Sequence, residues 1–284
     1  MKTILVLLAA LGFCILGALR FEPDRTLDGF NLRKYTTQSR RLRVLTWNIG
    51  TPDLQGSLGG RELAEHLVDI IERHQPDVVA LQEVRSSRLI DFLERRMTGY
   101  SGQIADGEDR DRHVALLVRD KAATFQTMES QAGHWALAAT LPSKAQDAPV
   151  VILNIHADAY SSRLRRLYTE QIVDWARARK SSATLVVGDF NFELDPKTRS
   201  DFFTDDRYND SESYSYLIQF FEDLGRRAGT TAIFDRRIDY VFASPAEVAV
   251  IEARVITGER IGEMDHNPLI VEVAFDEKRI PILK

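Results

Sequence analysis

Short polar stretches mark six points of this chain, and each lies at one end of an apolar run typical of a β-strand. The stretches are Trp47-Asn48, Gln82-Glu83, Asn154-Ile155-His156, Gly188-Asp189-Phe190-Asn191, Arg237-Ile238-Asp239-Tyr240 and Met264-Asp265-His266-Asn267-Pro268. This pattern constrains the fold, because strand ends from distant parts of the chain must meet before these side chains can share a site. The sequence therefore favours a sheet-based domain with a polar site at one sheet edge.

Strand-like runs outnumber helical ones between residues 42 and 275. Strands are predicted at 41–47, 77–81, 113–119, 134–141, 149–155, 184–187, 237–243, 248–256 and 268–275. Helices are predicted at 61–74, 86–97, 161–180 and 214–225, and the first three are amphipathic. Many strands with few intervening helices indicate two packed sheets flanked by helices. The segments 99–112 and 192–214 are expected to be loops that carry substrate choice.

The polar side chains follow some strands and precede others. Asn48, Glu83, His156 and Asp189 come at the C-terminal ends of their strands, whereas Asp239 and Asp265-His266 lie near the starts of theirs. Antiparallel pairing brings both kinds of strand end to one edge.

The N-terminus differs from the rest of the chain. Lys2 precedes an uncharged run from Thr3 to Leu19, which suits a signal peptide or a short signal anchor. Cleavage and retention both remain open, and both predict export to the periplasm or the extracellular space, with membrane anchoring through residues 3–19 if the run is retained. The predicted organisation is a leader at 1–19, a polar spacer at 20–41 and one catalytic domain at 42–284, which is expected to act as a monomer.

Composition excludes several kinds of chemistry. The single cysteine, Cys14, lies in the leader, so the exported part offers no disulfide, no cysteine nucleophile and no thiolate zinc site. The formal net charge of −5 gives no overall basic field for tight binding of nucleic acid. A nuclease remains compatible with this charge, because it engages only a few phosphates locally.

Carboxylates and amides predominate among the strand-end groups, and these suit hard cations such as Mg²⁺ and Mn²⁺. Glu83 ends a buried apolar strand, where an unpaired carboxylate is costly, so it is a candidate metal ligand. Asp189 and Asn191 are two apart, which in extended backbone places both on one side, where they can orient water and hold a phosphate oxygen. Gly188 is expected to let substrate approach the backbone. Taken singly, Glu83 is also compatible with an ordinary strand-end carboxylate, and Gly188-Asp189 with a turn.

His266 is expected to be held by a carboxylate, either Asp239 or Asp265. A histidine held in this way can act as an acid, a base or a phosphate clamp near neutral pH. His66 and His74 are expected on the polar side or end of a helix, and His134 at a strand start, all without a role in the site.

Taken in order, the six segments resemble the endonuclease/exonuclease/phosphatase superfamily over about residues 42–275. That superfamily includes DNase I-like nucleases, AP endonucleases, neutral sphingomyelinases and inositol polyphosphate 5-phosphatases. The resemblance implies an α/β fold, a DNase I-like four-layer α/β/β/α sandwich. It also implies Mg²⁺-dependent cleavage of a phosphoester by in-line attack of water, with Mn²⁺ as a possible substitute.

The resemblance also assigns roles to individual residues. Glu83 matches the metal-ligand motif, Asn48 contacts phosphate or metal, and Asp265-His266 is similar to the closing pair, with Asp265 near the metal. The implied catalytic residues are His156, near the scissile phosphate, Asp189, which orients water, Asn191, which stabilises the transition state and binds substrate, and Asp239, the partner of His266. Arg112 is similar to a phosphate-contacting arginine.

Two departures bear on the substrate. Gly50 replaces an acidic residue of AP endonucleases, and His156 replaces their tyrosine, so both argue against that branch. The acidic partner of His156 is not placed, although the loop with Asp106, Glu108, Asp109 and Asp111 offers candidates.

The function predicted from sequence is therefore an exported or anchored, metal-dependent phosphodiester hydrolase, an endonuclease acting on nucleic acid. The alternatives are a sphingomyelinase-like or inositol-phosphate phosphoesterase and, from another class, a catalytically inactive binding module. Competent side chains at every principal polar position argue against the inactive module.

Overall fold

The computed structural model describes residues 40–50, 58–105, 113–132, 134–142, 149–179, 183–195, 209–244, 248–262 and 264–275. The predicted leader, Arg112 and the acidic loop proposed to serve His156 lie outside these residues. Within the described ranges, no helix is both long enough and apolar enough to cross a membrane.

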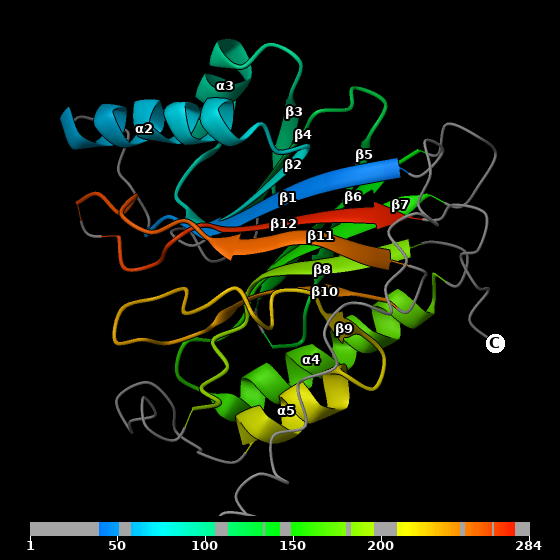
Figure 1. Ribbon diagram of the computed structural model, residues 1–284. Coiled ribbons are helices and arrows are strands. Elements are labelled where there is room, and N and C mark those ends of the chain that lie inside the picture. Colours follow the sequence, from blue (N-terminus) through cyan, green and yellow to red (C-terminus); the bar gives the residue numbers. More distant parts are fainter. Residues whose placement is uncertain are drawn as a thin grey trace, which may run out of the picture. The chain divides into compact units, whose positions relative to one another are not determined.

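Two six-stranded sheets form the centre of the domain (Figure 1). The first sheet has the order β11-β12-β1-β2-β4-β3, with bounds Val248–Val255, Leu269–Phe275, Arg40–Asn48, Val78–Val84, His113–Val118 and Ser101–Ile104. The second sheet has the order β5-β6-β7-β8-β10-β9, with bounds Thr124–Glu129, Trp135–Leu141, Val150–His156, Ala183–Asp189, Asp239–Ala243 and Glu222–Asp223.

Helices cover the outer face of each sheet. Helices α2 (Leu58–His74) and α3 (Ser87–Arg96) lie against the first sheet, and α4 (Ser162–Arg177) and α5 (Asn209–Leu217) lie against the second (Figure 1). Successive residues of β1 show why the layers form. Val44 packs between the sheets, whereas Leu45 and Trp47 pack on the α2 side, because side chains alternate along a strand. Central strands such as β4, β7 and β8 are buried along their whole length because both of their faces are covered.

The predicted two-sheet arrangement with flanking helices is confirmed, with local differences. The last predicted helix, at 214–225, is wrong in position: α5 spans Asn209–Leu217, and turns follow it. Its buried side chains include the polar residues Asp210 and Ser213, so an apolar stripe does not mark it. Part of the predicted loop 99–112 forms the short edge strand β3, and β5 and β9 are also additional edge strands.

Strand direction brings the polar ends together as predicted. β1 pairs with β2 in parallel, and β7 pairs with β8 in parallel. β10 runs antiparallel to β8, so that Asp239 lies opposite Asp189, and β12 runs antiparallel to β1. The C-terminal ends of β1, β2, β7 and β8 therefore meet the N-terminal ends of β10 and β12.

A polar cluster joins the two sheets inside their apolar interface. The Gln82 amide on β2 donates to Oδ1 of Asn154 on β7 at 2.7 Å and to the hydroxyl of Thr46 on β1 at 3.0 Å. The Asn154 amide donates back to the carbonyls of Leu81 and Ala115 in the first sheet, at 2.9 and 2.8 Å. All three polar side chains are fully buried, so these bonds align one sheet with the other.

Candidate active site

Asn48 connects the two halves of the site. Its Nδ2 donates to Oε1 of Glu83 at 3.1 Å and to Oδ2 of Asp189 at 3.0 Å. Its Oδ1 accepts the backbone N–H of Gly50 at 3.1 Å, so the amide group is held at both ends. The last residue of β1 thereby fixes a carboxylate of the first sheet against a carboxylate of the second.

Glu83 lies at an irregularity in β2. Pairing with β4 shifts register between Leu81 and Val84, and Glu83 has φ of +57°. A bulge of this kind redirects a side chain, and a left-handed backbone at a residue other than glycine is strained. The Glu83 side chain is 20% exposed, which leaves its carboxylate accessible from the site.

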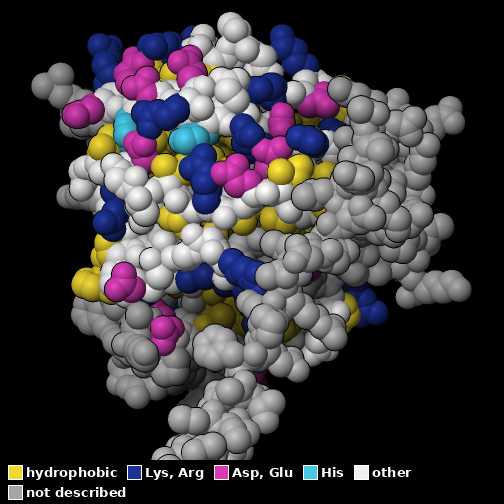
Figure 2. Space-filling view, in the orientation of Figure 1, with side chains coloured by type: hydrophobic (Ala, Val, Ile, Leu, Met, Phe, Trp, Pro, Cys, Tyr) yellow, Lys and Arg dark blue, Asp and Glu magenta, His cyan; other side chains and the backbone are white. Residues whose placement is uncertain are grey.

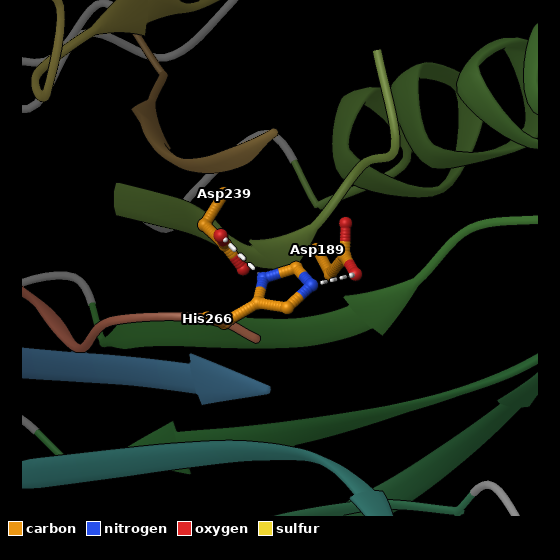
Figure 3. Close-up of side chains that lie close together, drawn as sticks. All are labelled: Asp189, Asp239 and His266. Atoms are coloured by element: carbon orange, nitrogen blue, oxygen red, sulfur yellow. Dashed lines mark hydrogen bonds and ion pairs between the residues drawn. The ribbon is translucent and has the colours of Figure 1, made fainter. Parts of the chain in front are cut away.

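His266 and Asp239 form a buried pair (Figure 3). Nδ1 of His266 lies 2.8 Å from Oδ2 of Asp239, and Nε2 lies 3.7 Å from Oδ2 of Asp189. Asp239 therefore holds the ring, whereas Oδ1 of the half-exposed Asp265 lies 3.8 Å from Nε2. Burial would lower the pKa of His266, but the charges of Asp239 and Asp189 outweigh it and raise that pKa to about 10. The charges of Asp239 and Asp189 thus favour the protonated form of the ring.

His156 is the second imidazole of the site. Its Nε2 lies 3.7 Å from Oδ2 of Asp189 and 3.8 Å from Oε1 of Glu83, and its side chain is only 6% exposed. The ring faces the same carboxylate oxygen as His266. Its nearest described carboxylates are therefore those of the site.

Two expectations for the Gly188–Asn191 stretch are wrong. Asn191 has φ of +51° and its N–H donates to Oδ1 of Asp189 at 2.9 Å, so the pair forms a turn and not an extended strand. Nδ2 of Asn191 donates to the carbonyl of Ala157 at 3.1 Å. Gly188 lies within β8, where an added Cβ would meet the Ile155 carbonyl oxygen at 2.0 Å. This glycine is required by strand packing and not by substrate approach.

A buried ion pair supports the loops on the second-sheet side. Arg165 on α4 donates to both oxygens of Asp210 on α5, at 2.7 and 2.8 Å, and both side chains are fully buried. Oδ2 of Asp210 also accepts the N–H of Glu193, and Arg165 donates to the carbonyl of Asp158 at 2.9 Å. One pair therefore anchors the chain just after Asp189 and just after His156.

The site offers the oxygen and imidazole donors that a divalent cation binds. Asp189, Asp239 and His266 present donor atoms within 4.8 Å of one another, which makes this a possible metal-binding cluster. These groups already pair with each other in the buried interior, however. Glu83 and the half-exposed Asp265 are the more accessible carboxylates of the site, and carboxylate oxygens are the ligands that a hard cation prefers.

A second histidine–carboxylate pair lies beside the site and was not predicted from the sequence. Nε2 of His134 lies 3.3 Å from Oδ2 of Asp158, and the His134 and His156 rings are 6.4 Å apart between centroids. No spacing links positions 134 and 158. The only available signal was an aspartate two residues after His156.

Bridged carboxylates, a second imidazole and a buried Asp–His pair at one edge of two packed sheets form a candidate site for phosphoester hydrolysis. Residues 45–260 match the model of the Endonuclease/Exonuclease/phosphatase family, and the chain belongs to this family. No curated protein matches the chain in sequence.

Solved structures with the same fold include several members of this family. An endonuclease/exonuclease/phosphatase from Bacteroides vulgatus has a TM-score of 0.65 at 19% identity, covering 84% of this chain and 100% of that chain. A mannosyl-6-phosphatase from Bacteroides thetaiotaomicron has a TM-score of 0.62 at 18% identity, covering 82% and 100%. D. rerio TDP2 complexed with single strand DNA product has a TM-score of 0.61 at 16% identity, covering 82% and 98%. At these identities the likeness establishes the fold.

Proposed function

We propose that this chain is a Mg²⁺-dependent phosphodiesterase that cleaves nucleic acid as an endonuclease. One observation carries the proposal: Asn48, His156 and His266 converge from three strand ends on Oδ2 of Asp189, at 3.0, 3.7 and 3.7 Å. A carboxylate surrounded by donors in this way is preorganised to bind and orient a water against an anionic substrate.

Each side chain has a role that follows from its contacts. Asp189 accepts a proton from the attacking water, while the Asn48 amide keeps Asp189 and Glu83 apart and in place. The imidazolium of His266, held by Asp239, donates from Nε2 to a phosphate oxygen as charge develops there. Mg²⁺ or Mn²⁺, held by Glu83 and Asp265, would supply Lewis-acid stabilisation of the phosphate.

Two features support a nucleic acid substrate. His156 occupies the position that DNase I-like members give to a histidine, and one structural neighbour, D. rerio TDP2, is complexed with single strand DNA product. Figure 2 shows Lys and Arg interspersed with Asp and Glu among the described residues of one face, so the basic side chains there form no continuous patch. We therefore propose local engagement of a few phosphates and rapid turnover, in keeping with the net charge of −5.

A phosphomonoesterase is the second candidate, because the neighbours also include a mannosyl-6-phosphatase. We further propose export, on the strength of the apolar run Thr3–Leu19, and action as a monomer.

The test is a substrate panel of plasmid DNA, RNA, sphingomyelin, inositol phosphates and sugar phosphates, each with Mg²⁺ or with EDTA. Endonuclease function predicts nicking of DNA or RNA that EDTA abolishes. His266→Ala, purified in parallel, should be inactive and so exclude a contaminating nuclease. Phosphate release from monoesters without cleavage of any diester would favour the second candidate. No turnover of any substrate would overturn the assignment as an enzyme.

A further inference from the structure

His134 and Asp158 form a pair whose geometry is fixed by the backbone. Nε2 of His134, just before β6, faces Oδ2 of Asp158 at 3.3 Å. Oδ1 of the same carboxylate accepts the N–H groups of Tyr160 and Ser161 at the start of α4, at 2.9 and 2.6 Å. Asp158 is therefore immobilised by the helix start, and it fixes the plane of the His134 ring in turn.

The His134 ring borders the candidate active site. Its centroid is 6.4 Å from that of His156 and 6.1 Å from that of Tyr168, which is fully buried. The His134 side chain is 23% exposed, against 6% for His156. Substrate can therefore reach His134 more easily than the imidazole beside it.

Asp158 occupies one of the two nitrogens of the His134 ring. The His134 hydrogen bond and the two backbone N–H groups outweigh burial and hold the pKa of Asp158 well below its usual range, so Asp158 is a carboxylate. With Nε2–H committed to that carboxylate, Nδ1 is the nitrogen left for a ligand. A protonated ring then offers a charged N–H donor, which matches a phosphate oxygen.

We propose that His134, oriented by Asp158, is a substrate-binding residue that donates from Nδ1 to a phosphate oxygen of the substrate. The inference rests on the proposed function, in which the substrate phosphate lies at the site where His156 and His266 both face Asp189. A hydrogen bond reaches about 2.9 Å from each ring nitrogen. With the two ring centroids 6.4 Å apart, a phosphate group beside His156 also lies near the His134 ring.

Kinetics with bis(p-nitrophenyl) phosphate and Mg²⁺ provide the first test. His134→Gln should raise KM about tenfold with little change in kcat, because a hydrogen bond to bound substrate is lost. His134→Arg should restore KM to within about threefold of the wild type, since a guanidinium also donates to phosphate. Asp158→Asn, which keeps the acceptor for the helix start, should give an intermediate KM.

The arginine variant separates binding from packing. A purely structural role against Tyr168 would not be rescued by arginine, and it would lower the unfolding midpoint of His134→Gln. His74→Gln, at the opposite end of the first sheet from the site, serves as the matched control. An unchanged KM in His134→Gln, or no rescue by arginine, would overturn the inference.

A binding measurement keeps the inference testable without turnover. The imidazole signals of ¹⁵N-labelled protein, assigned with His134→Gln, are followed by NMR while inorganic phosphate is added in Mg²⁺ buffer. A saturable shift of the His134 signal, with about tenfold weaker phosphate binding in His134→Gln, supports the inference even if the panel shows no hydrolysis and the proposed function fails. No response of that signal overturns the inference even if the enzyme is active.

Discussion

Replacing Asp239 with asparagine removes the carboxylate that holds His266, and we expect the ring to return to an ordinary titration. The pKa of His266 is about 10 because the charges of Asp239 and Asp189 outweigh burial, which acts to lower it. In Asp239→Asn, burial still lowers the pKa of His266, and the charges of Asp189 and the half-exposed Asp265 still raise it. The pKa of His266 should then fall below about 8, toward its ordinary value near 6.5.

The same shift makes stability depend on pH. The folded chain binds the His266 proton more tightly than the unfolded chain, so this stabilisation is fully present below about pH 6.5 and is lost as the pH rises toward about 10. At about 1.4 kcal/mol per pKa unit, the difference corresponds to an upper limit on the order of 5 kcal/mol. The unfolding free energy of the wild type should therefore decrease between pH 7 and pH 9, and that of Asp239→Asn should change much less.

Two measurements in EDTA check this. NMR of labelled histidine rings gives the pKa of His266, and urea unfolding at several pH values gives the slope. Asp265→Asn is the control, because that carboxylate is half exposed and 3.8 Å from Nε2, so the pKa of His266 should stay above about 9. The reasoning is refuted if His266 titrates near pH 6.5 in the wild type or above pH 9 in Asp239→Asn.

Three further predictions concern packing and the metal. Gly188→Ala places a Cβ against a backbone carbonyl of β7, so we expect a loss on the order of 3 kcal/mol of unfolding free energy, and a near-neutral result by urea unfolding would contradict the packing. Arg165→Met removes the cation that lies 2.7 Å from Asp210 and should cost roughly 3–5 kcal/mol, whereas Arg165→Met/Asp210→Leu should recover part of that loss. Additive losses in the double variant would show that the pair is not coupled. Glu83→Gln should weaken Mn²⁺ binding by more than about tenfold in calorimetry. Glu62→Gln, at an exposed position of α2, should leave Mn²⁺ affinity unchanged. An equal Mn²⁺ affinity of Glu83→Gln and the wild type would show that Glu83 is not a metal ligand.

The layered fold was predictable because its signals are local. Apolar runs such as 78–81 indicate a strand that is buried on both faces. A polar residue after each run indicates where the strand leaves the core. α5 was misplaced because Asp210 is buried through its ion pair with Arg165, a tertiary contact that helical periodicity does not register. Edge strands such as β5 were not predicted because little of their surface is buried, so no apolar run marks them.

That these polar side chains converge was more predictable than the geometry in which they meet. The residue pattern alone places Asp239 and Asp265 on equal terms as partners of His266. The family resemblance favours Asp239, and the register of β10 against β8 brings its carboxylate to the ring. The backbone at Asn191 enters a left-handed turn that spacing alone presents as a strand. The neighbours of His134 come from three-dimensional packing, which a list of strand ends does not contain.

The buried hydrogen bonds of Gln82 and Asn154 fix the position of one sheet relative to the other. A purely apolar interface is non-directional, so two sheets joined by it alone could slide by a fraction of a residue at small cost. Gln82 directly precedes Glu83, and Asn154 lies two residues before His156. A small shift between the sheets would break the buried hydrogen bonds of these two amides, at a cost of about 1–3 kcal/mol for each group left unsatisfied. The spacing between Glu83 and His156 is thus set from inside the protein. Surface loops can be exchanged for new substrates without readjusting the distance across the catalytic edge.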